Sequence, residues 1–347
     1  MAKTDKKSVR ESHSVNIFFE QNQYLPALYG ENDAHLERIE QMLHVVLVSR
    51  GNMMTITGLK RDTHATELIL QKLYNRVENG HDITMADVDA AIRMIPPVPE
   101  GKTVKHVIGE KEAESDVYIR TLKKTIVPYT HVQANYMRGL YDSDLLFALG
   151  PAGTGKTYIA VAMAVYQFMN KKVERIILSR PAVEAGEKIG FLPGDIKDKI
   201  DPYMRPLYDA LFDMMPAERV NEAIAAGEIE LAPLAFMRGR TFSNAFVILD
   251  EAQNTTRTQM KMFLTRMGEG ARMVITGDLS QIDLPKDIKS GLSDCIPKIE
   301  HISGIDVIRF SDVDVVRHPL AAKIIHAYDE WEEKKKHYAE EREGGVD

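Results

Sequence analysis

Cysteine is almost absent from this chain of 347 residues, because Cys295 is its single example. One cysteine cannot form an intramolecular disulfide, so the sequence excludes a disulfide-stabilised scaffold and suits the reducing cytoplasm. Long hydrophobic runs are also lacking, since the apolar stretch 246–249 is far shorter than the roughly 18 residues that a membrane span needs. The basic N-terminus is not followed by an apolar signal core, so we expect a cytoplasmic protein with no membrane segment.

Positive charge is in short supply, with 44 Lys and Arg against 51 Asp and Glu and a formal net charge of -7. A chain of this sign has no global field that attracts nucleic acid, so any such binding must come from a local patch. The sequence does contain 44% hydrophobic and 27% charged residues, which is enough for a buried core and a charged surface. This composition excludes a disordered, collagen-like or fibrous chain.

The chain shows no repeat with a period of about 20–50 residues, which excludes a solenoid or propeller. Its clearest seam is the proline-rich stretch 96–99, which can hold neither a regular helix nor a central strand. A charged run at 110–116 follows. We therefore expect a small domain over residues 1–95, a linker over 96–125, a larger domain over 126–330 and a charged tail over 331–347.

The N-terminal part has the pattern of a small α+β unit. Apolar spacing predicts helices over residues 32–43 and 62–77, and the runs 45–49 and 53–58 predict two strands joined by a turn. This order resembles the KH type of nucleic-acid-binding module, although the glycine pair that clamps the nucleic-acid backbone is missing. An interaction or oligomerisation domain is the alternative interpretation.

Apolar segments in the larger domain alternate with helical ones. This alternation predicts an α/β fold, a parallel sheet covered by helices on both faces. The expected strands are 145–149, 175–179, 229–231, 246–249, 273–275 and 307–310, and the expected helices include 156–169 and 256–267.

The first of these strands leads into a complete P-loop pattern, G-x-x-x-x-G-K-[ST]. Its glycines let successive backbone N–H groups point at phosphate oxygens, and the following helix presents its positive end to the same anion. The lysine adds a charge for the β- and γ-phosphates, and the threonine hydroxyl can bind Mg²⁺. The pattern comprises Gly150, Pro151, Ala152, Gly153, Thr154, Gly155, Lys156 and Thr157.

Two later strands end in polar residues that suit the same site. Asp250 and Glu251 follow the apolar run 246–249 at the strand end where open α/β sheets bind ligands. We assign Asp250 to Mg²⁺ and Glu251 to the attacking water, a pairing that an ATPase needs and a small-molecule kinase does not. After the strand at 273–275, Gln281 could sense the γ-phosphate or the water; a simple turn at Gly277 is the alternative.

These motifs together resemble the first motor domain of superfamily 1 helicases, a RecA-like fold. More narrowly, the chain resembles the bacterial PhoH-like ATPases, the longer members of which also have an N-terminal module. The resemblance covers about residues 125–330, and its distinctive stretches are residues 179–195, 237–241 and 314–319.

The resemblance implies binding of ATP with Mg²⁺, hydrolysis, a cytoplasmic location and a link to RNA metabolism. It also implies association with a ribosomal-RNA-processing endoribonuclease of the YbeY type. Gln133 matches the glutamine that reads adenine edges in such helicases, with an exposed helix glutamine as the alternative. Arginines suited to bidentate phosphate or RNA contacts are Arg180, Arg238, Arg240, Arg309 and Arg317.

Too few residues follow Pro319 for the second motor domain that supplies an arginine finger in true helicases. We therefore expect a homo-oligomeric ring in which a neighbouring subunit completes each site, with Arg317 as the first choice for the finger. Two other functions are open: a nucleotide-gated scaffold that docks a ribonuclease with little hydrolysis, and, less favoured, a small-molecule kinase.

Overall fold

The computed structural model describes residues 13–94, 117–181, 196–285, 287–316 and 331, and for residues 196–202 the backbone alone. Its contacts divide the chain into two units, Met1–Asp142 and Ser143–Asp347, each with a hydrophobic core of its own. The first unit includes helix α6 (His131–Asp142) and a short hairpin of β4 (Ile119–Arg120) and β5 (Thr125–Ile126), which spans the end of the predicted linker. The predicted domain boundary at 125 therefore stays a prediction.

The N-terminal part of the first unit is a three-stranded antiparallel sheet in the order β1-β3-β2. Buried side chains such as Leu28, Ile39, Ile56, Ile69 and Leu73 join the sheet to its helices. The strands are β1 (His13–Phe18), β2 (Val46–Arg50) and β3 (Met53–Gly58), and the helices are α1 (Leu25–Tyr29), α2 (Ala34–Leu43), α3 (Lys60–Glu78) and α4 (Met85–Arg93). The helix, hairpin and helix expected here are present; β1, α1 and α4 were not predicted, and the KH likeness stays a prediction.

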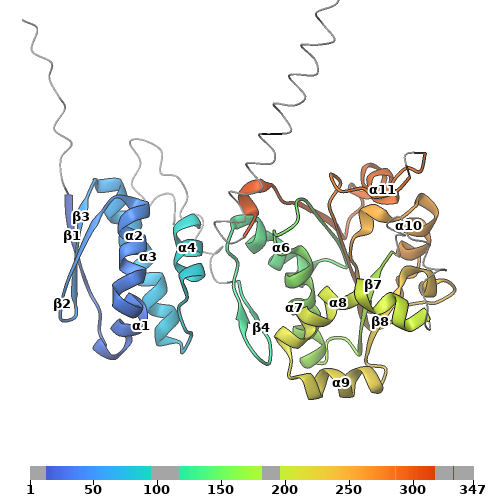
Figure 1. Ribbon diagram of the computed structural model, residues 1–347, viewed down its shortest axis with the longest axis horizontal. Coiled ribbons are helices and arrows are strands. Elements are labelled where there is room, and N and C mark those ends of the chain that lie inside the picture. The colour runs from blue at the N-terminus through green and yellow to red at the C-terminus, as the bar shows by residue number, and fades with distance from the viewer. Residues whose placement is uncertain (1–12, 95–116, 182–195, 286, 317–330, 332–347) are drawn as a thin grey trace, which may run out of the picture. The chain divides into compact units, whose positions relative to one another are not determined.

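The second unit confirms the predicted α/β fold, a RecA-like P-loop NTPase arrangement (Figure 1). Its sheet has six strands in the order β11-β6-β10-β9-β7-β8, and every neighbouring pair is parallel. The strands are β6 (Leu145–Leu149), β7 (Arg175–Arg180), β8 (Ile229–Pro233), β9 (Ala245–Leu249), β10 (Arg272–Gly277) and β11 (Ile305–Arg309). All six match the strands expected from the sequence to within two residues at each end.

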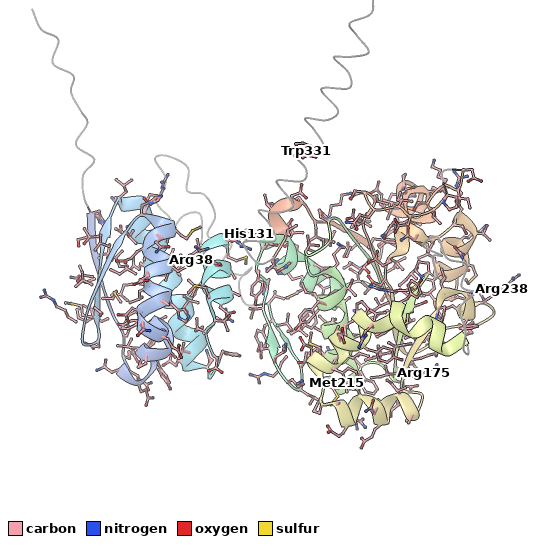
Figure 2. The ribbon with its side chains drawn as sticks, viewed as in Figure 1. Arg38, His131, Arg175, Met215, Arg238 and Trp331 are labelled. Atoms are coloured by element: carbon pink, nitrogen blue, oxygen red, sulfur yellow. The ribbon has the colours of Figure 1, made fainter. Side chains whose placement is uncertain are left out.

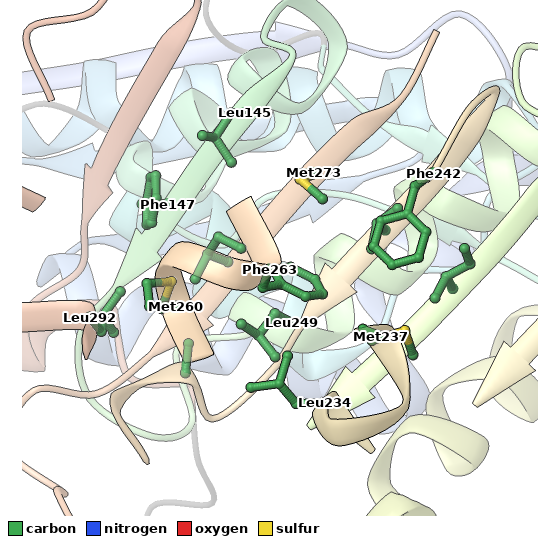
Figure 3. Close-up of a cluster of buried hydrophobic side chains, with 14 of the residues drawn as sticks. Leu145, Phe147, Leu234, Met237, Phe242, Leu249, Met260, Phe263, Met273 and Leu292 are labelled. Carbon is green, nitrogen blue, oxygen red and sulfur yellow. The ribbon is translucent and has the colours of Figure 1, made fainter. Parts of the chain in front are cut away.

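Helices cover both faces of this sheet. Helix α7 (Lys156–Met169) lies against β7, β9 and β10, and α8 (Ile196–Met214) packs on α7 and β7, with α9 (Ala217–Ala225) beyond it. On the other face, α10 (Arg257–Leu264) and α11 (Gly291–Ile299) pack on alternate strand residues (Figure 3). That core includes Phe147, Leu249, Met260, Phe263 and Leu292. Burial on both faces explains why these strands are nearly continuous apolar runs.

Parallel pairing brings the carboxyl ends of all six strands to one edge of the sheet. Strand β10 lies between β6 and β9, so the loop after β6 faces the residues after β9 across a single strand. Backbone hydrogen bonds join the loop to its neighbours: Gly150 N–H donates to Gly277 O at 3.1 Å, and Val316 N–H donates to Gly153 O at 2.9 Å. This edge holds the candidate site.

Within the part of the chain that the structure describes, every helix is too short or too polar to cross a membrane.

Candidate phosphate-binding site

The glycine-rich loop after β6 turns sharply between the strand and α7. Gly150 has a φ of 142°, and a Cβ added there would lie 2.5 Å from the carbonyl oxygen of Phe310. Gly155, with a φ of 83°, is the left-handed residue that immediately precedes α7. Both positions require glycine, because a side chain would be strained at either φ angle and, at Gly150, would also collide with Phe310, which follows β11. The loop therefore leads its backbone directly into the N-terminus of α7.

Lys156 is the first residue of α7 and is buried, with 8% of its surface exposed. Its Nζ donates to the carbonyl oxygens of Gly150 at 2.6 Å and Pro151 at 2.7 Å, and to Thr154 Oγ1 at 3.3 Å. The ammonium is thus held over the loop by neutral acceptors. A neutral acceptor binds an ammonium less strongly than an anion does, so an anionic phosphate oxygen would compete well for the same donor.

Asp250 lies directly after β9 and is 2% exposed. Its Oδ1 accepts hydrogen bonds from Thr157 Oγ1 at 2.6 Å and from Thr276 Oγ1 at 2.5 Å. Its Oδ2 accepts two from Arg180, from Nε at 2.8 Å and from Nη2 at 2.5 Å. Donors from α7, β10 and β7 therefore fix the carboxylate from three sides.

Glu251 differs from Asp250 in its exposure to solvent and in its backbone conformation. Its side chain is 48% exposed, and its backbone is left-handed at a φ of 55°, an uncommon conformation for a residue other than glycine that often marks a functional site. The carboxylate is held by Gln253, whose Nε2 donates to Glu251 Oε2 at 2.6 Å. The structure thus places one buried and one accessible carboxylate side by side.

Gln253 joins this carboxylate to the loop after β10. The amide is 1% exposed; Nε2 also donates to the carbonyl of Gln281 at 3.2 Å, and Oε1 accepts from Asp278 N–H at 3.1 Å. Gln281 in turn donates through Nε2 to Asp278 Oδ2 at 2.8 Å. One buried side chain therefore links the ends of β9 and β10.

These groups surround a cavity of about 250 Å³. Its lining combines the phosphate-loop backbone, one ammonium and several oxygen donors, a composition suited to a polyphosphate and its cation. The lining residues are Ala152, Gly153, Gly155, Lys156, Thr157, Tyr158, Asp250, Glu251, Gly277, Asp278 and Gln281.

Thr157 and Asp250 present a hydroxyl and a carboxylate oxygen 2.6 Å apart at the cavity wall. Hard oxygen donors in this number suit Mg²⁺, which is commonly bound by one or two protein oxygens together with substrate phosphates. Among the described residues, no group of three or more His, Cys, Asp and Glu could form a dedicated metal site. The donor set therefore fits Mg²⁺ that arrives with a nucleotide.

The structure brings the predicted loop, Asp250, Glu251 and Gln281 to this one cavity. Gln133 belongs to the first unit, where its side-chain oxygen accepts a hydrogen bond from Tyr129 N–H at 2.6 Å and its surface is 3% exposed. The exposed-helix alternative for Gln133 is therefore wrong, whereas its role in reading adenine stays a prediction. Arg317 lies outside the described residues.

The other candidate arginines lie in different surroundings. Arg240 forms a bidentate pair with Glu230 at 2.5 and 2.7 Å, and Arg309 pairs with Glu300 at 2.6 Å. Arg238 is exposed and extends from the surface of its unit (Figure 2). None of these three lines the cavity, so their contacts with phosphate or RNA stay predictions.

Three residues around the predicted carboxylates make contacts that were not predicted from the sequence. Thr276 and Gln253 were given no role, although both are buried against the predicted carboxylates. Arg180 donates to Asp250, a contact that was not predicted, and its contact with phosphate or RNA stays a prediction. Spacing could have suggested Gln253, because it follows Glu251 by only two residues. The contacts of Thr276 and Arg180 with Asp250 join different strands, and such contacts leave no signal in a single sequence.

The chain is similar in sequence to a family of known proteins. A family model described as PhoH-like protein matches residues 125–329. A PhoH-like protein of Bacillus subtilis (strain 168) is 46% identical over 303 residues, 87% of this chain and 93% of that protein. A PhoH-like protein of Mycobacterium leprae (strain TN) is 47% identical over 309 residues, 88% of this chain and 86% of that protein. Among solved structures, the UvsW helicase from bacteriophage T4 aligns with a TM-score of 0.34 and 12% identity, over 70% of this chain and 78% of that chain.

Proposed function

The chain belongs to the PhoH-like protein family, and from that premise we propose that it is a Mg²⁺-dependent ATPase that acts on RNA in the cytoplasm as a motor or switch. The observation that carries this proposal is the contact between Thr157 of the phosphate loop and Asp250 of β9, at 2.6 Å. It joins the two elements that ATP hydrolysis requires, an anion cradle and a cation-binding carboxylate.

Lys156 is proposed to neutralise phosphate charge. Its ammonium group donates hydrogen bonds to the carbonyl oxygens of Gly150 and Pro151. When phosphate oxygens take the place of these carbonyls, charged acceptors replace neutral ones. The loop N–H groups and the N-terminus of α7 act on the same anion. Nucleotide binding therefore needs no large rearrangement of the loop.

Mg²⁺, when bound, would neutralise developing phosphate charge and polarise the transferred phosphoryl group. Thr157 and Asp250 would hold it. Thr276 and Arg180 would keep the Asp250 carboxylate in a fixed orientation, since both donate to it in the structure.

Glu251 is proposed as the general base. A base must reach a water, and the Glu251 carboxylate lines the cavity and is exposed, whereas Asp250, which also lines it, is buried and accepts hydrogen bonds at both carboxylate oxygens. Gln253 donates to Oε2, so Oε1, which lies 3.8 Å from Arg180 Nη2, is the oxygen proposed to accept the proton of the water. Gln281 is proposed to detect loss of the γ-phosphate, since it lines the same cavity from the loop after β10.

Phosphate release with and without RNA tests this function. We expect ATP turnover by the native chain, stimulation by RNA and not by DNA, and loss of turnover in Lys156→Ala. Absence of nucleotide binding by calorimetry in folded native protein would overturn the proposal.

A second candidate is a nucleotide-gated scaffold that docks an endoribonuclease of the YbeY type and hydrolyses little ATP. The four hydrogen bonds that Asp250 accepts from Thr157, Thr276 and Arg180 favour this candidate, because a catalytic cation would have to displace at least one of them. Glu251→Gln separates the two. A motor should trap ATP and lose its RNA-stimulated turnover, while a scaffold should bind the ribonuclease as the native chain does.

A further inference from the structure

Arg180 is the charged group packed behind the Thr157–Asp250 pair. Its side chain is 16% exposed and that of Asp250 is 3% exposed, so the two charges form a buried ion pair at the carboxyl ends of β7 and β9. Arg180 does not line the cavity, and its contact with Asp250 comes from the side of the carboxylate that faces away from Thr157.

The guanidinium is fixed by a second anchor. Its Nη1 donates to the backbone oxygen of Tyr203, in α8, at 2.8 Å, while Nε and Nη2 both donate to Asp250 Oδ2. Nη2 also lies 3.8 Å from Glu251 Oε1. All three guanidinium nitrogens are therefore engaged, and the positive charge cannot leave the carboxylate without breaking several hydrogen bonds.

The Asp250 carboxylate has no acceptor capacity to spare. A carboxylate offers about four lone-pair sites, and four donated hydrogen bonds from Thr157, Thr276 and Arg180 reach Asp250. A divalent cation at the Thr157–Asp250 pair would have to displace a hydroxyl hydrogen bond. It would also share one carboxylate with a guanidinium that already neutralises it.

We propose that Arg180 sets the affinity of the Thr157–Asp250 pair for divalent cations, holding it low until nucleotide phosphates add negative charge. Arg180 is thus a positioning residue that makes metal binding depend on nucleotide binding. Like charges in a partly buried site repel strongly, whereas two or three phosphate groups make the local charge much more negative and so attract a cation. The inference rests on the proposed function, because it assumes that a nucleotide and its cation meet at this site.

The test measures binding of Mn²⁺, a paramagnetic substitute for Mg²⁺, by loss of the free-ion electron paramagnetic resonance signal. Without nucleotide, we expect weak binding by the native chain and binding at least about tenfold tighter by Arg180→Gln, which removes the charge and keeps one donor. Arg180→Lys, which keeps the charge, should bind Mn²⁺ as weakly as the native chain. With saturating ADP, the difference between Arg180→Gln and the native chain should shrink.

The matched control is Arg38→Gln. Arg38, labelled in Figure 2, also forms a two-bond pair with a carboxylate, donating to Asp89 at 2.7 and 3.3 Å, but in the other unit. Its Mn²⁺ affinity should equal the native value. Unchanged or weaker Mn²⁺ binding by Arg180→Gln would overturn the inference.

Two measurements keep the inference distinct from folding and from the proposed function. Circular dichroism shows whether Arg180→Gln folds. If it does not fold, Mn²⁺ binding by the native chain still tests the inference, because tight binding without nucleotide would contradict it. Binding of a fluorescent ATP analogue in EDTA reports the nucleotide site alone. If the ATP analogue binds but the Mn²⁺ affinities do not differ as expected, the proposed role of Arg180 is wrong and the proposed nucleotide site is retained. If the analogue does not bind, the proposed function itself is wrong.

Discussion

At the scale of single residues, Gln253 is the side chain on which the geometry around Glu251 depends. Its amide makes three hydrogen bonds that join Glu251, the carbonyl of Gln281 and the N–H of Asp278. Replacement by alanine would free the base to move and leave the buried Asp278 N–H without its partner. A lost partner of this kind costs about 1–3 kcal/mol.

We therefore expect Gln253→Ala to lower ATP turnover about tenfold or more, since a misplaced general base loses much of its contribution. The dissociation constant for nucleotide should change little, because Gln253 does not line the cavity. Steady-state kinetics and nucleotide titration measure the two quantities separately.

Gln259→Ala is the matched control for this change. Gln259 caps α10 by accepting from Thr256 N–H at 2.8 Å, so its loss should reduce stability by about 1 kcal/mol and leave turnover per folded molecule unchanged. Equal turnover in Gln253→Ala and Gln259→Ala would show that Gln253 does not position the general base.

Cys295 gives a prediction that needs no ligand. Burial raises the pKa of its thiol to about 11, against an ordinary value of 9.0. At pH 8 the reactive thiolate should thus be about a hundredfold scarcer in the folded chain than in the unfolded one, and it should increase as the pH rises towards 11. Alkylation rates with and without urea test this directly, because the chain has one cysteine. Similar rates in both states would contradict the burial of Cys295.

The sequence alone predicted these residues unevenly. The phosphate loop and Asp250 could be found because spacing within one segment dictates their geometry. The contact of Arg180 with Asp250 could not, since it joins residues 70 positions apart through the pairing of β7 with β9. The same holds for Thr276, which reaches Asp250 from the neighbouring β10.

At the scale of elements, β2 is an edge strand whose outer side is protected by one side chain. The N–H of Leu47 donates to Glu40 Oε1, on α2, at 2.6 Å, and β2 pairs only with β3 among the described strands. Exposed edge strands with unpaired N–H groups promote association between molecules. Exposed Val46 and Val48 would add to that tendency.

We expect Glu40→Ala to lower the free energy of unfolding by about 1 kcal/mol and to increase self-association. Urea denaturation and light scattering measure these two effects. Glu37→Ala, an exposed carboxylate on the same helix, should show neither. Light scattering that is identical for the two variants would mean that Glu40 does not protect the edge.

Elements were predicted best where burial imposes a clear pattern. The four central strands of the second unit, β6, β10, β9 and β7, are buried on both faces, and all six strands were located from the sequence. Strand β1 was missed because its alternation is short: polar Ser14 and Asn16 are exposed beside Val15 and Ile17, but Phe18 is apolar and exposed. Pairing with β3, rather than local propensity, makes it a strand.

At the scale of the whole molecule, the cavity lacks an arginine among its described lining residues, and Arg180 behind it is bound to Asp250. We therefore expect the finger to come from a neighbouring subunit in a homo-oligomeric ring, as the sequence suggested. Turnover per chain should then rise with protein concentration in the range where light scattering detects assembly with ATP and Mg²⁺. Brisk turnover by a monomer would rule out this arrangement.

The hydrogen bond from Val316 to Gly153 has a practical consequence. The polypeptide runs from β11 past Phe310, against which Gly150 packs, and then touches the glycine loop itself. Force applied to the chain beyond Val316, by an optical trap or a bulky fluorescent fusion, would pull on the backbone that we propose binds the anion. Handles and affinity tags are therefore best attached at the opposite terminus.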